Sequence, residues 1–263
     1  MDRIARALEL ARQQRTKLVP VAKEEVPDHI EYTETRKVEV DHAILRENRI
    51  IVGYGKEPLA DAYKLLRTRV LRRMRQNGWT TLGITSASMG DGKTLTAINL
   101  ALAIAMEPNQ SVLLVDTDLR RPSVHKRFGI DLEMGLEAHL VSGVKIEELL
   151  VNPGFERFTL LPCAQPLAGS SEVLASKRMG RLVDELKGRY PSRMVIFDLP
   201  PVLVSDDVAA FSTHLDSVLL VVGDGKTRSR ELARAVELLE GVELLGTVLN
   251  RTEEHSKGQY DYY

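Results

Sequence analysis

Short apolar segments alternate with helical patterns along the chain from residue 79 onward. The apolar segments are continuous runs rich in Val, Leu and Ile, which is typical of strands buried on both faces of a parallel sheet. Strands are predicted at 80–85, 111–116, 158–162, 193–198, 217–222 and 244–249, with helices between them at 93–106, 171–188 and 228–241. This alternation predicts an α/β fold, a parallel sheet sandwiched by helices, with its ligand site at the carboxyl ends of the strands.

A further helical pattern precedes the first predicted strand. Apolar residues recur at helical spacing from Leu59 to Met74, and Asn77 with Gly78 provides a helix stop. The other positions of this segment are crowded with basic side chains, which are Lys64, Arg67, Arg69, Arg72, Arg73 and Arg75. Such a basic face is either solvated or forms an interface with an acidic surface of a neighbouring molecule.

The N-terminal part of the chain has a different character. Residues 1–17 combine a narrow apolar face with five basic side chains, typical of a helix that docks on a partner or membrane surface, or of a marginal solvated helix. Residues 18–49 have little periodicity and predict a linker. We therefore divide the chain into an N-terminal helix and linker (1–49), an α/β domain (50–251) and a C-terminal tail (252–263).

The composition is that of an ordinary globular protein. The 263 residues include 36 Lys and Arg against 37 Asp and Glu, a formal net charge of −1, and 43% are hydrophobic. This balance argues against a general nucleic-acid binder. Cys163 is the single cysteine, which excludes an intrachain disulfide and a cysteine cluster for zinc. No apolar stretch approaches the roughly 18 to 20 residues of a transmembrane helix, and the N-terminus lacks a signal-peptide core, so we expect a cytoplasmic protein.

One glycine-rich segment carries the strongest chemical information. The stretch from Ala87 to Thr94 reads ASMGDGKT, follows a predicted strand and opens a predicted helix, which is the context of a P-loop. Gly90 and Gly92 let backbone N–H groups face phosphate oxygens, and the helix N-terminus favours the same anion. Lys93 would reach the β- and γ-phosphates and Thr94 would bind Mg²⁺. The residues predicted here to contact ATP are Ser88, Met89, Gly90, Asp91, Gly92, Lys93, Thr94 and Leu95.

Acidic residues end two of the predicted strands. Asp116 and Asp118 follow one strand in the sequence VDTDLRRP, and Asp198 ends another in FDLPP. A hydrophobic strand that ends in Asp near a P-loop is typical of a Walker B arrangement, which binds Mg²⁺ directly or through water. The alternative for each acid alone is a loop-start or helix-cap residue. Together with the P-loop, the pattern predicts a P-loop NTPase-type fold with a metal site formed by Thr94, Asp116 and Asp198.

Tyrosine is concentrated at the C-terminus. Three of the seven tyrosines, Tyr260, Tyr262 and Tyr263, lie among the last four residues, after a polar segment. Tyrosines beside an acid in such a tail are typical of phosphoacceptors, and each phosphorylation would add about −1.5 to −2 charges. The alternative is an unstructured tail or an aromatic plug packed on the same subunit.

With these elements the chain resembles the bacterial tyrosine kinases of capsule and exopolysaccharide synthesis over roughly residues 57–263. The resemblance lies in the P-loop, the DxDLRRPxxH stretch from Asp116 to His125, the FDLPP at 197–201 and the tyrosine-rich tail. The opening MDRIARALELA is similar to the N-terminal helix of autokinases in exosortase-associated systems. The resemblance implies ATP- and Mg²⁺-dependent phosphorylation of tyrosines, chiefly on the tail of a neighbouring subunit.

The resemblance also implies catalytic roles for four residues. Lys93 would hold the phosphates, and Asp198 would complete the metal site with Thr94. Asp116 would accept or orient the proton of the tyrosine hydroxyl, with Asp118 supporting metal or hydroxyl placement. A base is reasonable because free tyrosine has a pKa near 10 and is neutral at pH 7.

Further residues follow from the same resemblance. Arg120 and Arg121 would contribute positive charge to the transferred group. Asn250, followed by Arg251, matches the position that often contacts adenine in this broader fold. The P-loop has Met89 where many relatives carry Pro.

The family's oligomerisation helix has the pattern ExxRxxR. The aligned residues here are Asp61, Lys64 and Arg67, which keep the signs of charge but lose the longer acid and one bidentate guanidinium. We expect these residues to lie at the interface of a ring or other homo-oligomer.

The resemblance implies three kinds of partner: a separate membrane-spanning chain-length regulator, further copies of the chain, and a cognate phosphotyrosine phosphatase. The regulator's cytoplasmic tail would complete the nucleotide site and recruit the kinase to the inner face of the membrane. No nucleic-acid partner is expected.

Two other functions stay open at this point. A ParA/MinD-like switch ATPase would use nucleotide-driven dimerisation without phosphorylating protein. Such proteins carry KGGxGK, whereas this chain has Ser88 in place of the first lysine. A binding module that uses ATP only to hold a regulator in shape would bind ATP without forming phosphotyrosine.

Overall fold

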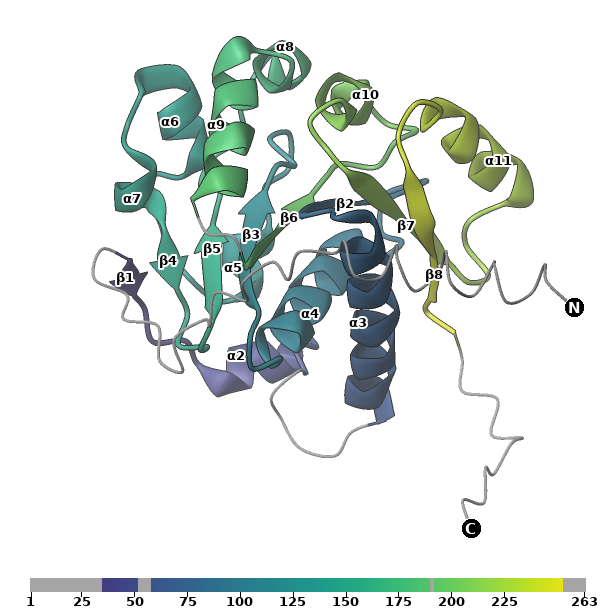
Figure 1. Ribbon diagram of the computed structural model, residues 1–263, viewed down its shortest axis with the longest axis horizontal. Helices are drawn as coiled ribbons and strands as arrows, with labels where there is room; N and C mark the ends of the chain where they lie inside the picture. The colour runs from purple at the N-terminus through teal and green to yellow at the C-terminus, as the bar shows by residue number, and fades with distance from the viewer. Residues whose placement is uncertain (1–34, 52–57, 190–191, 253–263) are drawn as a thin grey trace, which may run out of the picture.

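The computed structural model describes residues 35–51, 58–189 and 192–252 (Figure 1). The predicted helix at 1–17, the first part of the predicted linker and the three C-terminal tyrosines lie outside the described residues, so the predictions about them stay predictions. Within the described ranges, no helix is long and apolar enough to cross a bilayer.

The described strands form one sheet at the centre of the molecule. They are β1 (Arg36–Lys37), β2 (Thr81–Ser86), β3 (Ser111–Asp116), β4 (Val151–Asn152), β5 (Phe158–Leu161), β6 (Arg193–Asp198), β7 (Ser217–Gly223) and β8 (Leu244–Asn250). Their order is β1-β4-β5-β3-β6-β2-β7-β8, and every neighbouring pair is parallel except β4 with β5. All six strands predicted from apolar runs are confirmed. The two-residue strands β1 and β4 were not predicted, because two residues carry no period.

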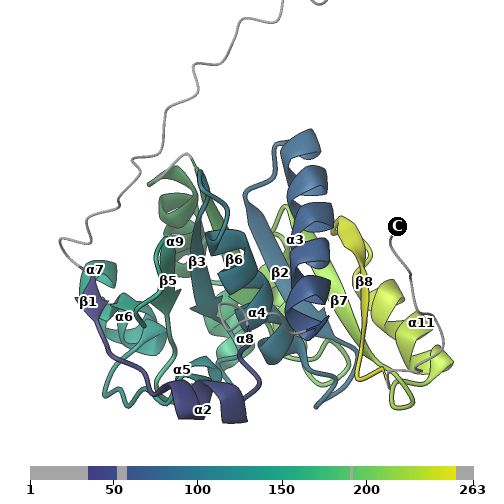
Figure 2. The ribbon, with the colours of Figure 1, turned by 90° about the horizontal axis from the view of Figure 1, so that it is seen from below.

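Helices cover both faces of the sheet (Figures 1 and 2). They are α2 (His42–Glu47), α3 (Pro58–Asn77), α4 (Lys93–Ala105), α5 (Val124–Arg127), α6 (Leu136–Ser142), α7 (Ile146–Leu149), α8 (Ser170–Leu174), α9 (Lys177–Gly188), α10 (Asp207–Ser212) and α11 (Ser229–Leu238). Helices α3 and α4 pack on one face, and α9, α10 and α11 lie on the other (Figure 2). The predicted sandwich of a parallel sheet between helices is therefore confirmed.

Central strands are apolar throughout because both of their faces are buried. In β3, Val112 and Leu114 pack in the core under α3 and α4, whereas Leu113 and Val115 pack in the core of the opposite face. Burial on both sides removes the alternation of polar and apolar residues that a half-exposed strand shows. Polar functional side chains therefore lie at the strand ends, as Asp116 does at the end of β3.

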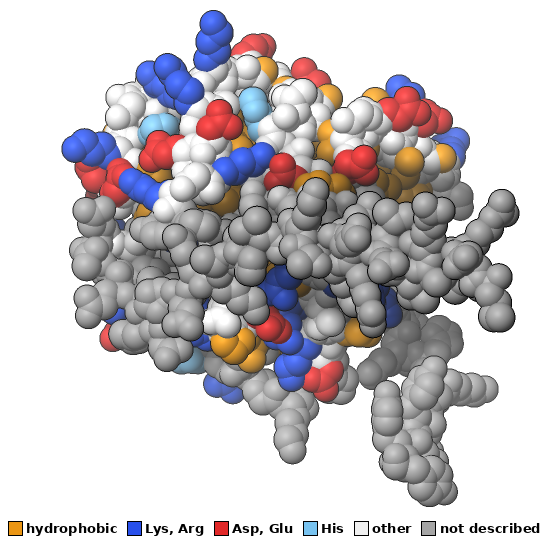
Figure 3. Space-filling model, in the orientation of Figure 1, with side chains coloured by type: hydrophobic (Ala, Val, Ile, Leu, Met, Phe, Trp, Pro, Cys, Tyr) orange, Lys and Arg blue, Asp and Glu red, His pale blue; other side chains and the backbone are white. Residues whose placement is uncertain are grey.

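One predicted helix is split in two. The pattern at 171–188 forms α8 and then α9, because Ser176 caps α9 by accepting a 3.2 Å hydrogen bond from the N–H of Met179 on its side-chain oxygen. The predicted helix stop after α3 is confirmed, since α3 ends at Asn77 and Gly78 has a φ of 68°. Charged side chains of both signs are interspersed over the visible described surface in Figure 3, as the near-zero net charge implies.

Part of the predicted linker belongs to the folded domain. Residues 36–37 pair with β4 as an edge strand, and Asp41 caps α2 by accepting a 2.7 Å hydrogen bond from the N–H of Ala43. Leu45 and Ile50 are fully buried in the core under α3 and α4. The structure therefore differs from the predicted linker between residues 36 and 49. A helix of six residues is too short to show a clear period in the sequence.

Candidate active site

The P-loop, residues 87–92, connects β2 to α4 and depends on two glycines with left-handed backbone. Gly90 has a φ of 77° and Gly92 a φ of 100°. A Cβ on Gly90 would collide with Nζ of Lys226, and one on Gly92 would collide with Nδ2 of Asn250. Both positions therefore favour glycine for its backbone conformation, and Gly92 also for the close approach of the Asn250 amide, whereas the flexible end of Lys226 can move away from Gly90.

Hydrogen bonds from neighbouring segments fix the shape of the loop. Asp91 is fully buried and accepts a 3.0 Å hydrogen bond from the N–H of Ser88. Asn250, at the end of β8, donates from Nδ2 to the carbonyl of Asp91 at 2.8 Å. Lys226 donates to the carbonyl of Met89 at 2.5 Å. The structure shows the amide of Asn250 holding the P-loop, and its predicted contact with adenine stays a prediction.

The N-terminus of α4 has no side-chain cap. Gly92 stands at the cap position and makes no side-chain hydrogen bond to the first N–H groups of this 13-residue helix. Free N–H groups and the positive end of the helix dipole favour an anion at this place. The arrangement fits the phosphates of a nucleotide.

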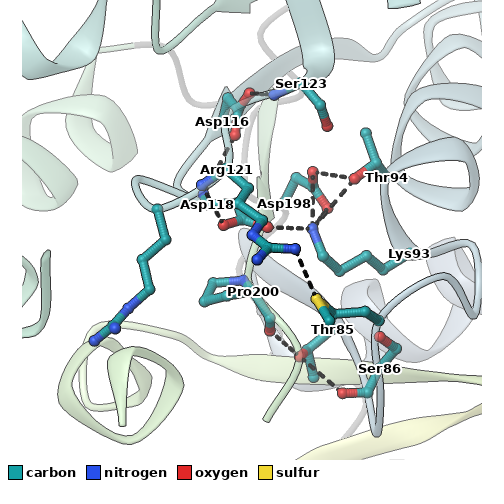
Figure 4. Close-up of polar contacts among 12 residues, drawn as sticks. Thr85, Ser86, Lys93, Thr94, Asp116, Asp118, Arg121, Ser123, Asp198 and Pro200 are labelled. Carbon is teal, nitrogen blue, oxygen red and sulfur yellow. Dashed lines mark hydrogen bonds and ion pairs between the residues drawn. The ribbon is translucent and has the colours of Figure 1, made fainter. Parts of the chain in front are cut away.

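Lys93 lies at the centre of the site, between two carboxylates (Figure 4). Its Nζ is 2.8 Å from Oδ2 of Asp118 and 3.4 Å from the carboxylate oxygens of Asp198. Burial alone would lower the pKa of Lys93, but the charges of Asp198 and Asp118 raise it above its ordinary value. Lys93 is therefore a permanent cation whose charge is already balanced by carboxylates in this structure.

Thr94 and Asp198 come together from the P-loop helix and the end of β6. The hydroxyl of Thr94 donates a 2.7 Å hydrogen bond to Oδ2 of Asp198, which is fully buried. Burial raises the pKa of Asp198 above its ordinary value, against the opposing effect of Lys93. A buried anion with one ammonium and one hydroxyl partner is suited to a second cation nearby.

Asp116 is held by backbone hydrogen bonds from the loop that follows β3. It is fully buried, and its Oδ2 accepts hydrogen bonds of 3.0 Å from the N–H groups of Ser123 and Val124 at the start of α5. Burial, and then the charge of Asp198, raise the pKa of Asp116 to about 8. The residue holds the loop after β3 in place and lies behind Asp118, whose N–H is 3.3 Å from Oδ1 of Asp116.

The residues present fit a magnesium ion that is held jointly with phosphates. Among the described residues, no group of three or more His, Cys, Asp or Glu side chains is arranged to hold a metal by itself. Mg²⁺ characteristically uses one or two carboxylates together with substrate phosphates and water. The hydroxyl of Thr94 and the carboxylate of Asp198 supply such a partial ligand set beside the open N-terminus of α4.

The two arginines of the DLRRP stretch have different surroundings. Arg120 makes a two-pronged contact with Asp207, from Nε at 3.1 Å and from Nη2 at 3.0 Å. Asp207 is fully buried and also accepts a 2.8 Å hydrogen bond from the hydroxyl of Ser170. Arg121 instead lies over the P-loop, with Nη1 3.0 Å from the sulfur of Met89 (Figure 4). Arg120 therefore ties the loop to α10, and the sequence alone gave no reason to single out Asp207.

A cleft of about 630 Å³ opens over these groups. It is lined by Glu47, Asn48, Arg49, Met89, Gly90, Gly92, Lys93, Thr94, Leu95, Asp118, Arg120, Arg121, Ser123, Arg127, Pro200, Pro201, Val204, Ser205, Asn250 and Arg251. Most of the residues predicted to contact ATP belong to this lining. Residues 47–49 were missed, because they were predicted to form a linker.

The predicted oligomer residues lie on α3, outside the cleft lining. Asp61 and Lys64 form an ion pair of 2.8 Å with each other on the exposed surface of the helix. Arg67 donates to the carbonyl of Ala103 at 3.2 Å and pairs with Glu107 at 2.9 Å, at the C-terminus of α4. Arg67 is thus bound within its own subunit, and assembly through this helix stays a prediction.

Comparison with known proteins places this site in a family. A family model described as an AAA domain matches residues 80–254. Tyrosine-protein kinase YwqD of Bacillus subtilis (strain 168) is 31% identical over 221 residues, 83% of this chain and 92% of that protein. The chain belongs to the family of bacterial tyrosine-protein kinases. Tyrosine-protein kinase etk of Escherichia coli (strain K12) is 30% identical over 215 residues, which are 81% of this chain but 29% of etk.

The fold of this kinase agrees with solved kinase domains. The kinase domain of Escherichia coli tyrosine kinase ETK superposes with a TM-score of 0.74 at 26% identity, covering 89% of this chain and 95% of that one. The family resemblance read from the P-loop, the DLRRP stretch and the FDLPP segment is therefore confirmed. The roles of single residues in this kinase are proposals, argued below from their geometry.

Proposed function

We propose that this kinase transfers the γ-phosphoryl group of ATP to Tyr260, Tyr262 and Tyr263 on the tail of a neighbouring copy. The observation that carries the proposal is the convergence of Lys93, Thr94 and Asp198 at the open N-terminus of α4. Anion-binding N–H groups, a buried cation and a metal-binding pair then lie at one place, as phosphoryl transfer requires. ATP and Mg²⁺ are the cofactors of this proposal.

The reaction forms one P–O bond and breaks another. The tyrosine oxygen bonds to the γ-phosphorus as the bond from that phosphorus to the β,γ-bridging oxygen breaks, and ADP leaves with the bonding electrons. The phenolic proton passes to a carboxylate of the enzyme. When bound, Mg²⁺ neutralises negative charge on the phosphates.

Lys93 has two successive roles in this proposal. In the structure its ammonium balances Asp118 and Asp198, at 2.8 Å and 3.4 Å. Engagement of Lys93 with the β- and γ-phosphates releases Asp118, which lines the cleft. Nucleotide binding thereby frees a carboxylate at the place where a hydroxyl would enter.

Two carboxylates compete for the role of proton acceptor. The prediction from sequence favours Asp116, and a pKa of about 8 suits a base near neutral pH. Its full burial and its two backbone hydrogen bonds keep it from the cleft, however. We assign the first contact with the tyrosine hydroxyl to Asp118, which lines the cleft, and assign to Asp116 the ordering of the loop before α5.

The wider setting of the proposal is exopolysaccharide or capsule export. A membrane-spanning chain-length regulator would activate the kinase and recruit it to the inner face of the membrane, and a phosphotyrosine phosphatase would reset it. These partners follow from the family resemblance. Phosphorylated tails, each carrying added negative charge, would loosen a homo-oligomer, so phosphorylated protein is expected to elute as a smaller species than dephosphorylated protein.

Mixing a variant without a working site and a variant without acceptor tyrosines tests the proposal. Lys93→Met keeps the tail but lacks the catalytic cation, and the triple variant Tyr260→Phe, Tyr262→Phe, Tyr263→Phe keeps the site but lacks acceptors. With γ-labelled ATP and Mg²⁺, each variant alone should stay unlabelled on the tail, and their mixture should label the tail of the Lys93→Met chain. ATP hydrolysis by the wild-type protein without phosphotyrosine, also with a regulator fragment added, would instead favour the switch ATPase.

A further inference from the structure

Helix α2 ends in a hydrogen-bonded motif that normally selects glycine. The N–H of Arg49 donates to the carbonyl of Arg46 at 2.9 Å, and the N–H of Ile50 donates to the carbonyl of Leu45 at 2.8 Å. Leu45 and Ile50 are both fully buried in one core. These two bonds and the apolar contact define a Schellman motif, in which the residue after the cap adopts a left-handed backbone.

That left-handed position is occupied by arginine. Arg49 has a φ of 58°, a conformation that costs energy for a residue with a Cβ and that glycine adopts freely. Non-glycine residues held in this region cluster at functional sites, where the surrounding structure enforces them. Arg157 and Arg251 share this conformation, and of the three arginines Arg49 and Arg251 line the cleft.

The backbone of Arg49 is fastened to the P-loop helix. Asn99, buried on α4, donates from Nδ2 to the carbonyl of Arg49 at 3.1 Å and accepts from the N–H of Ile51 at 3.0 Å. Helix α4 also carries Lys93 and Thr94 at its start. The position of Arg49 is thus fixed relative to the phosphate-binding residues.

Arg49 is one of the residues that line the cleft. It is exposed, and the same cavity is lined by Lys93, Thr94 and Asp118. Across the part of the chain that the structure describes, no carboxylate pairs with it. Arg120, in contrast, is neutralised by Asp207. Arg49 therefore brings uncompensated positive charge to the cleft.

Neighbouring contacts place Arg49 on the side of the catalytic carboxylates. Asn48 and Arg127 exchange two hydrogen bonds, of 3.1 Å and 3.3 Å, which dock α2 on α5. Helices α2 and α5 lie side by side in Figure 2. Helix α5 follows β3 and holds Asp116 at its start, whereas Asn250 ends β8 on the far side of β2 in the sheet. Arg49 therefore belongs to the side of the site formed by α2 and α5, and not to the side formed by Asn250 and β8.

We propose that Arg49 is a catalytic residue that acts within its own chain, with its guanidinium donating hydrogen bonds to the oxygens of the transferred phosphoryl group. The inference rests on the proposed function, because it requires ATP in this cleft. In the transition state the negative charge is spread over three equatorial oxygens whose planar arrangement differs from the ground state, so a guanidinium fixed to fit them accelerates transfer more than it strengthens binding. The turn at the end of α2 thereby holds one residue of the active site, Arg49, in place.

Arg49→Gly is the decisive variant, because it removes the side chain and supplies the residue that the backbone prefers. Its Tm should equal or exceed that of the wild-type protein. The Kd for Mg²⁺–ATP should change by no more than about threefold, while the rate constant of tail phosphorylation falls by at least about 100-fold. Arg49→Lys should recover only part of the rate, because the lysine ammonium keeps the positive charge but cannot donate the two parallel hydrogen bonds of a guanidinium.

The matched control is Arg46→Ala, which removes an equal charge from the exposed surface of α2. It should retain the wild-type rate. A wild-type rate in Arg49→Gly would overturn the proposal, and so would a parallel loss of Tm, nucleotide affinity and rate, which marks a purely structural role. If the wild-type protein forms no phosphotyrosine, the proposed function fails, and Arg49 is then judged by ATP hydrolysis, which Arg49→Gly should slow by a similar factor.

Discussion

The hydroxyl of Thr94 donates a 2.7 Å hydrogen bond to Oδ2 of Asp198, and this contact joins the P-loop helix to the end of β6. The two residues are 104 positions apart in the chain, and both belong to the proposed magnesium site. Their contact makes the magnesium dependence of the kinase testable without any measurement of phosphorylation.

Thr94→Val should remove the stabilisation that Mg²⁺ adds to ATP. In the wild-type protein, Mg²⁺–ATP at 100 times its Kd should stabilise the fold by about 2.7 kcal/mol, which raises Tm by several degrees, and excess EDTA should remove most of that shift. Valine keeps the shape of threonine but has no oxygen for the metal. Thermal denaturation with a non-hydrolysable ATP analogue measures both effects. Thr94→Ser, which keeps the hydroxyl, is the control, and an equal Mg²⁺ effect in Thr94→Val would contradict the assignment.

Asp116→Asn should stabilise the ligand-free protein relative to the wild type, and this advantage should increase as the pH rises. Burial and Asp198 raise the pKa of Asp116 to about 8 in the folded state, whereas the unfolded value is about 3.9. Between these values the native state binds a proton that the unfolded state has lost, so wild-type stability falls as pH rises through that window. The neutral amide escapes this loss while its oxygen still accepts from Ser123 and Val124.

Urea denaturation at pH 5, 6.5 and 8 measures the difference between Asp116→Asn and the wild-type protein. The advantage of the variant should grow steadily over this series. Asp206→Asn removes one negative charge from an exposed side chain and controls for the change in net charge. A difference that does not depend on pH would show that Asp116 is ionised throughout.

Gly92→Ala should abolish nucleotide binding and destabilise the fold. Its left-handed backbone strains any residue with a Cβ, and the new methyl group would also collide with Asn250. We expect a loss of about 2 to 3 kcal/mol in the free energy of unfolding. Gly241→Ala is the matched control, because Gly241 has a similar φ of 95° and nothing within 4 Å of its Cβ position. Gly241→Ala should lower the free energy of unfolding by about 1 kcal/mol and leave nucleotide binding intact. Equal losses of stability in the two variants would show that the methyl group at position 92 does not collide with Asn250.

Arg120 and Asp207 should show energetic coupling in a double-mutant cycle. Asp207 is fully buried, but Arg120 is 46% exposed, so solvent screening reduces the coupling energy to about 1 kcal/mol. The cycle compares Arg120→Ala, Asp207→Ala and the double variant by urea denaturation. The exposed pair of Arg234 and Glu237 is the reference and should give at most about 0.5 kcal/mol. Equal coupling in the two pairs would show that Arg120 does not anchor the loop to α10.

Much of the fold and of the phosphate site could be predicted from the sequence because the signals are local. The central strands are continuous apolar runs, as β3 shows, and the P-loop is a contiguous segment whose glycines are required by its own backbone. Asp116 and Asp198 were found because each ends such a run. Parallel strands place their carboxyl ends at one edge, so the sequence also predicted that these acids lie together.

The surroundings of those groups were decided by tertiary structure. The burial that raises the pKa of Asp116, the pairing of Arg120 with Asp207 across 87 residues, and the docking of Asn48 on Arg127 across 79 residues arise from contacts between distant segments. Arg49 shows the limit most clearly: in the sequence it is one basic residue of a presumed linker. The sequence by itself determined the strands, the P-loop and the acids at the strand ends, because hydrophobic period and glycine content act within a few residues. Only the packing of α2, α4 and α5 decided which side chains face the cleft and which charges they bring to it.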